Sequence, residues 1–422
     1  MIRTVGKVIR GEGLASAIRR TNERIGYALH GAASRVLGTF AGASEATILN
    51  VAASGTALRL GGVQTQLASR LRIERDLRNV ALLSPGLLEQ TGSRRVGSDL
   101  ETGIREAMSI TGARAVHFEG MHAVPLPVVL RLIESGVRVI VTSHDFSLFC
   151  ARPHLIEEPM GRFCFYSEDF ERCHRCLRQT WDVPPDSQPE RRALAREILL
   201  SAAGLIFPSQ FLLDEHRRLF SLPDLVAEVI EPGVSNVPMR AAESKRAVAF
   251  AGSAKRHKGA HLLPDIAQRL PSADIHIFGG GDEDLLRAMR RVPNITVHGY
   301  FRAGTLPSLL VRHGIGLVVL PSIWPETHSL VLSEVWLAGA AVAAFDLGAP
   351  AERIRQHGGG WLTPLETGAD GLAMIIEQWT GGENNTEVMR SVASPVDAAR
   401  AHVEWYRRLG VHNGALASSP AG

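Results

Sequence analysis

Two glutamates lie at the ends of a short stretch, "PETHSLVLSE" (325–334), whose residue types could carry chemistry. Glu326 and Glu334 are eight positions apart, and a run of small apolar residues, "VWLAGAAVAAFDLGA", follows Glu334. A pair of carboxylates can act as a general acid and base, or can accept hydrogen bonds from the hydroxyls of a sugar. The apolar pattern predicts a buried helix here, with Glu334 about one turn inside it and Glu326 just before it.

The start of this helix adds a second kind of group to the site. Its first N–H groups have no partner within the helix, and they form the positive end of the helix dipole. The residues concerned are Thr327, His328, Ser329 and Leu330. Such N–H groups bind anions such as phosphate, and the two carboxylates on either side could accept hydrogen bonds from a sugar and a ribose. Together these groups predict a nucleotide-sugar site.

Polar residues follow three other predicted strands. His144 comes after "VRVIVTS", a basic loop containing Arg256 and Lys258 comes after "AVAFAGS", and Gly61 and Gly62 come after "ILNVAA". Each has an ordinary alternative, namely a structural histidine, a solvated loop or a tight turn. A histidine at a strand end can assist proton transfer, cations suit a diphosphate, and glycines allow close approach of one.

All four cysteines of the chain fall in one segment, at Cys150, Cys164, Cys173 and Cys176. Four thiolates suit tetrahedral zinc, and the CxxC pair is a usual half-site. The segment shows little regular periodicity, so we expect a structural zinc to hold it together. Four free thiols and an iron–sulfur cluster are the alternatives.

The elements that would position these residues form two series. Short apolar strands alternate with helix patterns over residues 46–235, with the Cys-rich knuckle (150–176) inserted, and again over residues 245–390. This alternation predicts two α/β domains with doubly wound parallel sheets, joined by a linker and facing each other across a cleft. Residues 1–45 read as a basic amphipathic helical arm. Residues 391–422 read as a helix that crosses back between the domains, followed by a disordered tail.

Composition narrows the class of protein further. The chain has 422 residues and 45 % apolar content, enough for two buried cores, and its net charge of +3 gives no indication of a nucleic-acid partner. Charges interrupt the N-terminus and every long apolar run, so we expect neither a secretory signal nor a membrane span. A cytoplasmic protein is predicted. The basic arm is either a solvated helix or a peripheral contact with the inner membrane.

These motifs also carry a family resemblance. "FPSQF", "EPGV", "FAGSAKRHKG", "IFGGGDE" and "PETHSLVLSE" occur, after Gly61-Gly62 and the "HD" of His144, in the order seen in retaining family-4 glycosyltransferases. The chain resembles this family, also described as glycosyl transferases group 1, over about residues 47–360. The resemblance implies a GT-B fold and transfer of a sugar from a nucleotide-diphosphate sugar to a hydroxyl acceptor.

The resemblance also implies roles for matched positions. Glu326 would bind the donor sugar, Glu334 the ribose diol, and Lys258 the departing diphosphate, while His144 would lie near the anomeric carbon. The backbone of residues 327–330 would hold the sugar and diphosphate, with Gly62 opposite, and no catalytic metal is expected. Similar Cys-rich inserts occur in some bacterial polysaccharide glycosyltransferases. The basic arm and the family resemblance together favour a glycan or lipid-linked acceptor at the inner membrane, in cell-surface polysaccharide synthesis.

The chain departs from the family pattern at two places. Ser253 stands where an arginine is common, so Lys255 or Arg256 is the candidate replacement, and Thr327, His328 and Ser329 stand where Gly, an aromatic residue and Gly are common. The missing arginine keeps open a non-catalytic scaffold that binds nucleotide sugars. A glycoside hydrolase using Glu326 and Glu334 is a further alternative, which the phosphate-binding features around them disfavour.

Overall fold

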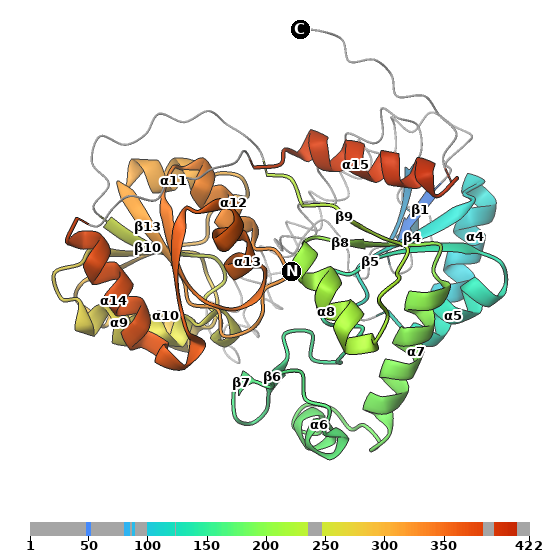
Figure 1. Ribbon diagram of the computed structural model, residues 1–422, viewed down its shortest axis with the longest axis horizontal. Helices are drawn as coiled ribbons and strands as arrows, with labels where there is room; N and C mark the ends of the chain where they lie inside the picture. The colour runs from blue at the N-terminus through green and yellow to red at the C-terminus, as the bar shows by residue number, and fades with distance from the viewer. Residues whose placement is uncertain are drawn as a thin grey trace, which may run out of the picture.

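A computed structural model describes residues 48–51, 80–84, 87–88, 99–122, 124–234, 247–382 and 392–411. The predicted arm (1–45), Gly61, Gly62 and most of the predicted linker and tail lie outside the described residues. The described chain forms two lobes, each built around one sheet (Figure 1).

The first sheet has seven strands in the order β3-β2-β1-β4-β5-β8-β9, and all neighbours are parallel except β2 and β3. Its strands are β1 (Ile48–Val51), β2 (Val80–Ser84), β3 (Leu87–Leu88), β4 (Ala115–Glu119), β5 (Arg138–Thr142), β8 (Gly204–Phe207) and β9 (Ala227–Val229). The strands β1, β4 and β8 are buried along their whole length, as expected where helices cover both faces of a parallel sheet.

Helices cover both faces of this sheet. The core on one face includes residues of α4 (Leu100–Thr111), α5 (Leu126–Glu134), α7 (Ser187–Ser201) and α8 (Gln210–Phe220). The other face is covered by α15 (Pro395–Arg408), whose Trp405 and Tyr406 pack on Ile48 and Ile140. A capping box formed by Ser394 and Asp397 starts this helix. Because α15 packs on the first sheet, the chain returns from the second lobe to the first near its C-terminal end (Figure 1).

The second sheet has six parallel strands in the order β12-β11-β10-β13-β14-β15. They are β10 (Ala247–Ala251), β11 (Ile275–Phe278), β12 (Ile295–Gly299), β13 (Ile315–Leu320), β14 (Ala341–Phe345) and β15 (Gly360–Thr363). One face packs on α9 (Leu263–Arg269), α10 (Glu283–Arg290) and α14 (Gly368–Thr380), and the other on α11 (Leu306–Arg312), α12 (Leu330–Leu337) and α13 (Gly348–His357). The predicted fold class, two doubly wound α/β domains, is confirmed.

The two lobes are in direct contact. Helix α8 of the first packs beside α13 of the second, and the backbone N–H of Phe211 donates to the Glu352 carboxylate at 3.0 Å. Trp324, from the loop after β13, is 6 % exposed and belongs to the hydrophobic core of the first lobe. The loop that carries Glu326 is therefore anchored in both domains.

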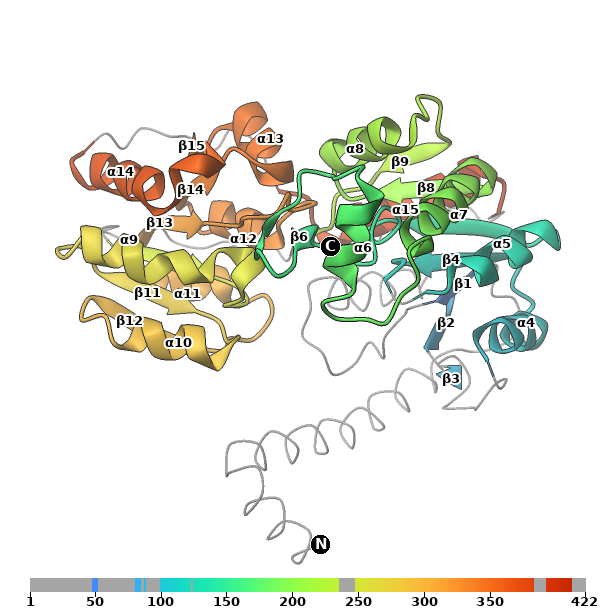
Figure 2. The same ribbon diagram turned by 90° about the horizontal axis from the view of Figure 1, so that it is seen from below.

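The Cys-rich segment projects from the first lobe beside the second (Figure 2). It contains the hairpin β6 (Ile156–Glu157) and β7 (Arg162–Phe163), followed by α6 (Phe170–Leu177). The segment shows little regular periodicity in the sequence, and the structure nevertheless forms the helix α6 in it. The Asp169 side chain accepts a hydrogen bond from Arg172 N–H and caps this helix, which the sparse apolar pattern did not reveal.

Among the described residues, no helix is both long and apolar enough to cross a membrane.

Candidate active site

Two loops at the carboxyl ends of β10 and β13 bring a lysine and a glutamate together. Gly259 has φ +71°, and a Cβ there would lie 1.7 Å from the carbonyl oxygen of Pro321, so only glycine allows this approach. The Ile323 N–H donates to the His257 carbonyl at 3.0 Å. Because the loops pack backbone to backbone, the Lys258 ammonium lies 2.9 Å from the Glu326 carboxylate.

Burial and hydrogen bonds to both its side chain and its backbone fix the position of Glu326. It is 5 % exposed, accepts a short hydrogen bond from the Ser322 hydroxyl, and its backbone carbonyl accepts from the Ala349 N–H at 2.7 Å. Burial alone would raise the pKa of Glu326, but the Lys258 ammonium and nearby hydroxyls together hold it below the ordinary value. Glu326 is therefore an ionised, pre-oriented acceptor at neutral pH.

Glu334 lies in a different environment, on α12. Burial raises the pKa of this carboxyl to about 7, although the Gly304 N–H donates to it. The carboxylates thus have opposite properties, one held ionised and one close to half-protonated at neutral pH. Glu334 lies inside the helix as predicted, and its binding role stays a prediction.

The loop between the glutamates is fixed by both domains. The Thr327 hydroxyl donates to the His144 carbonyl at 2.6 Å, and the Ser209 hydroxyl donates to the Thr327 carbonyl at 2.7 Å. Ser329 has φ +69°, a conformation that favours glycine, which agrees with the family's preference for Gly there. Helix α12 begins at Leu330, so the N–H groups of residues 327–330 do lie at a helix start.

Arg353 supports this loop from within the second domain, and the sequence reading missed it. Its guanidinium, in a residue 3 % exposed, donates to the carbonyls of His328 and Ser329 at 3.0 and 3.2 Å, and to the Ser333 hydroxyl at 2.9 Å. A buried cation on α13 therefore orients the chain where the predicted anion site begins. The only sequence signal was an arginine on the apolar side of "PAERIRQHG", which resembles ordinary helix patterning.

His144 follows β5 as predicted and lies between the domains. Its ring is half-buried beside the end of β4, where a Cβ on Gly120 would lie 3.6 Å from the ring, and its carbonyl receives the Thr327 hydroxyl. The structure therefore brings His144, Lys258 and the Glu326 loop to one place. Their catalytic roles stay predictions.

The structure places Arg256 differently from Lys258. A Cβ at Gly161 would come within 2.7 Å of the Arg256 guanidinium, so this side chain lies against the Cys-rich insert. Lys255 and Ser253 are exposed. Replacement of the missing family arginine by Arg256 or Lys255 stays a prediction.

The insert meets the basic loop through aromatic rings. His154 stacks on His257 with ring centroids 4.1 Å apart, and meets the Trp324 ring edge-on at 4.6 Å. The Lys258 ammonium lies 5.4 Å from the centre of the same Trp324 ring. Burial lowers the pKa of His154 to about 3 and that of His257 to about 4, so both rings are neutral and add no charge near Lys258. The insert therefore contacts the residue next to Lys258 and the Trp324 ring that lies beside the Lys258 ammonium.

The four cysteines line one cavity of the insert. The Arg152 N–H donates to Cys150 Sγ at 3.4 Å, the Glu158 N–H donates to Cys176 Sγ at 3.2 Å, and backbone groups of Tyr166 and Ser167 bond to Cys164. Cys173 and Cys176 are three positions apart in α6, so they lie on the same face of this helix. The structure thus gathers residues that are up to 26 positions apart (176 minus 150).

Comparisons with known proteins agree with this geometry. Residues 245–380 match the family model described as "Glycosyl transferases group 1". A phosphatidyl-myo-inositol mannosyltransferase of Mycolicibacterium smegmatis is 30 % identical over 116 residues, which cover 27 % of this chain and 29 % of that protein. The matched region thus spans less than a third of this relative.

Solved structures share the fold over most of the chain. A sucrose-phosphate synthase from Thermosynechococcus elongatus superposes with a TM-score of 0.65 at 14 % identity, covering 86 % of this chain and 99 % of that one. The Anabaena protein HepE in complex with UDP and glucose gives 0.54 at 17 % identity, covering 86 % and 95 %. The chain has a GT-B fold, and residues 245–380, in its second domain, match the family model described as "Glycosyl transferases group 1".

Proposed function

We propose that this protein is a retaining glycosyltransferase that moves a sugar from a nucleotide-diphosphate sugar to a hydroxyl acceptor. One observation carries the proposal: an ionised, buried Glu326 is paired with Lys258 at the carboxyl ends of adjacent strands in a glycosyl transferases group 1 domain. Open α/β sheets bind ligands at this edge.

The proposed mechanism gives each group one task. Glu326 accepts hydrogen bonds from hydroxyls of the donor sugar, and Lys258 turns its ammonium toward the diphosphate as the glycosidic C–O bond breaks. The N–H groups at the start of α12 share the developing charge. The acceptor hydroxyl attacks the anomeric carbon from the face that the diphosphate leaves, and its proton passes to a departing phosphate oxygen, so the configuration is retained. Glu334 binds the ribose diol.

Two further features bear on the acceptor. The relative from Mycolicibacterium smegmatis is named for a lipid, phosphatidyl-myo-inositol, and the sequence predicts a basic amphipathic arm over residues 1–45. Both favour a lipid-linked glycan acceptor reached from the cytoplasmic side of the inner membrane.

The Cys-rich insert completes the proposal with a structural zinc. Cys150, Cys164, Cys173 and Cys176 line one cavity, and backbone N–H groups already bond to thiol sulfurs there, as they would to zinc-bound thiolates. No three of the four sulfurs, which all belong to the described part of the chain, lie within 4.8 Å of one another, so a zinc ion would have to draw them closer together. A bound zinc would hold the loop that contains His154 against His257. Such an ion would stabilise the insert and would take no part in the transfer.

A donor panel tests the function. Full-length protein is incubated with UDP-, GDP- and ADP-sugars, and both the melting temperature and the release of nucleoside diphosphate are measured. We expect one donor class to raise the melting temperature and to release its nucleotide. The release should fall by about 100-fold or more in Glu326→Gln, whereas Glu366→Gln, an exposed carboxylate of the same domain, should leave it unchanged.

The same experiment separates the rivals. A scaffold would show the thermal shift without release of nucleotide from any donor. A hydrolase would cleave a glycoside with no nucleotide present. This alternative is tested because the pKa of Glu326 is lowered and that of Glu334 is raised, as in the acid and base pair of a hydrolase. Retention is checked by the anomeric configuration of the first product in an NMR spectrum.

A further inference from the structure

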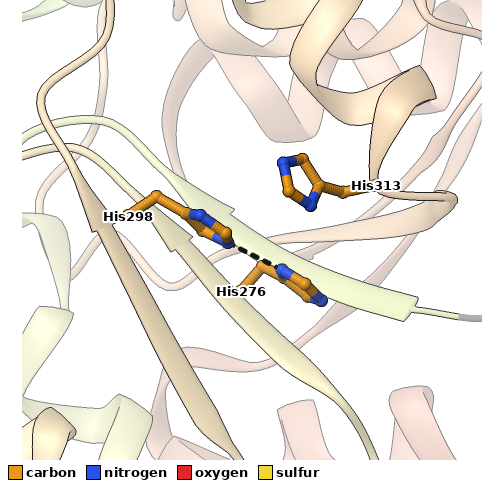
Figure 3. Close-up of side chains that lie close together, drawn as sticks. All are labelled: His276, His298 and His313. Carbon is orange, nitrogen blue, oxygen red and sulfur yellow. Dashed lines mark hydrogen bonds between the residues drawn. The ribbon is translucent and has the colours of Figure 1, made fainter.

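Three histidines of the second domain lie together, away from the proposed donor site. His276 is on β11, His298 on β12, and His313 directly follows α11 (Figure 3). One ring nitrogen from each lies within 4.8 Å of the other two. Within the described part of the chain, no other group of three or more His, Cys, Asp or Glu residues meets this criterion.

An aspartate fixes which nitrogen of His276 is available. The Nε2 atom of His276 lies 3.0 Å from the Asp274 carboxylate, so the ring proton of the neutral imidazole is on Nε2. Nδ1 then carries the lone pair, and it faces His298 Nε2 at 2.8 Å. A histidine that donates one N–H to a carboxylate and offers its other nitrogen is the usual arrangement of a metal-bound imidazole.

The spacing of the nitrogens is close to what a metal ion needs. Zn–N bonds of about 2.0–2.1 Å in a tetrahedral site separate two ligand nitrogens by roughly 3.3 Å. The observed 2.8 Å is a hydrogen bond between the rings, so a bound ion would replace that hydrogen bond after a shift of about half an ångström. His298 is exposed, so its ring can move and its proton can exchange to Nδ1 through solvent.

The local environment favours neutral rings. Burial and the neighbouring imidazoles lower the pKa values of His298 and His313, and a neutral imidazole is the form that binds metals. Phe278 stacks on His298 with centroids 4.5 Å apart and closes one side of the group.

The cluster is separate from the proposed catalytic machinery. Asp274 and His313 precede β11 and β13, at the amino ends of these strands, whereas His298 is the fourth of the five residues of β12. The three histidines are carried by β11, β12 and the end of α11, whereas Lys258 and Glu326 lie on the loops after β10 and β13. The cluster therefore shares no residue and no loop with the proposed catalytic groups.

We propose that His276, His298 and His313 bind a divalent transition-metal ion such as Zn²⁺, with Asp274 orienting His276. Three imidazoles leave one position of a tetrahedral ion for water. The ion would link the edge strand β12 and the end of α11 to β11, three segments otherwise joined by packing and one strand ladder. Binding to the folded state alone stabilises the domain by mass action.

The experiment measures a difference in bound metal between matched variants. Full-length protein is stripped with a chelator, titrated with Co²⁺ and analysed by metal content and absorption. The test variant is His298→Gln combined with His313→Gln, and the control is Thr296→Gln, an exposed residue on the same face of β12. The native protein and the control should each bind one more equivalent of Co²⁺ than the test variant. This extra equivalent should not increase the absorption of thiolate-bound Co²⁺, because its ligands are imidazoles.

A second readout guards against misfolding. Excess Zn²⁺ should raise the melting temperature of the native protein and the control by more than it raises that of the test variant. Equal metal content in all three proteins overturns the proposal, as does a loss of the extra equivalent in Thr296→Gln. The difference between variants does not depend on whether the Cys cluster holds its own ion.

Discussion

The Lys258 ammonium lies 2.9 Å from the Glu326 carboxylate and 5.4 Å from the centre of the Trp324 ring. Lys258 belongs to the loop after β10, whereas Glu326 and Trp324 belong to the loop after β13. The pair neutralises a buried carboxylate before any donor arrives. In the proposed mechanism the diphosphate of the donor becomes the partner of Lys258, and hydroxyls of the donor sugar become the partners of Glu326. Donor binding therefore replaces the ion pair between these two residues with contacts to the donor.

Removing Lys258 should destabilise the protein through Glu326. In Lys258→Met the buried carboxylate loses its cation, and we expect the free energy of unfolding at pH 7.5 to fall by about 1–3 kcal/mol. The double variant Lys258→Met with Glu326→Gln should recover most of this loss, because no buried charge remains. Urea denaturation of the two single variants and the double variant measures the coupling.

The pH dependence of the same pair has a defined sign. The folded-state pKa of Glu326 is held below its ordinary value of 4.5, so the pair contributes stability above that pH and loses it as the pH falls through the folded value. This account is contradicted if the losses of stability in Lys258→Met and Glu326→Gln simply add up in the double variant. It is also contradicted if the stability of Lys258→Met falls with decreasing pH to the same extent as that of the native protein.

Glu334→Gln should make the protein more stable and less active. The folded pKa of about 7 lies above the ordinary 4.5, so the folded state binds more protons between these values and stability falls as the pH rises through that window. The uncharged amide avoids the cost of ionising a buried carboxyl. We therefore expect the free energy of unfolding at pH 8 to rise by about 1–2 kcal/mol, a figure that allows for the partial exposure of this side chain. The gain should vanish near pH 4.

Activity gives the second half of that test. If Glu334 binds the ribose diol, the KM for the donor should rise by about tenfold in Glu334→Gln, and the native KM should improve as the pH rises through about 7. Glu283→Gln, an exposed carboxylate in the first turn of α10, serves as the control. An unchanged KM in Glu334→Gln would remove the ribose role.

Arg353→Met should disturb the start of α12. The methionine fills part of the space but leaves the carbonyls of His328 and Ser329 and the hydroxyl of Ser333 without the guanidinium. We expect a loss of about 2–4 kcal/mol in stability and a larger KM for the donor. Arg355→Met, on the same helix and half exposed, should cost less than about 1 kcal/mol.

Loss of two thiolates should empty the proposed zinc site. In Cys173→Ser with Cys176→Ser we expect no zinc bound to the insert after reconstitution, and a strong chelator should lower the melting temperature of this variant by less than it lowers that of the native protein. Metal analysis and thermal melting check both expectations. Purified native protein with four titratable thiols and no zinc or iron in the insert would show that the cysteines are free.

How far the sequence predicted the site differs from residue to residue. The carboxyl ends of β5, β10 and β13 were predictable because strand patterns are local, and so His144, Lys258 and Glu326 could be named in advance. Their meeting was predictable only as a consequence of the fold class, since parallel strands end at a common edge. The helix α6 was missed because its stability comes from the Asp169 cap and packing of the insert, which an apolar pattern does not record.

The sequence by itself determined the two α/β domains and the residue types at the ends of several strands, because periodicity and turn chemistry act over a few neighbouring positions. Only the tertiary structure decided that Lys258 neutralises Glu326, that Arg353 holds the loop before α12, and that three histidines up to 37 positions apart (313 minus 276) meet at one sheet. Those relationships depend on contacts between segments distant in sequence. Charge, burial and pKa follow from such contacts, so they become defined only when the chain is folded.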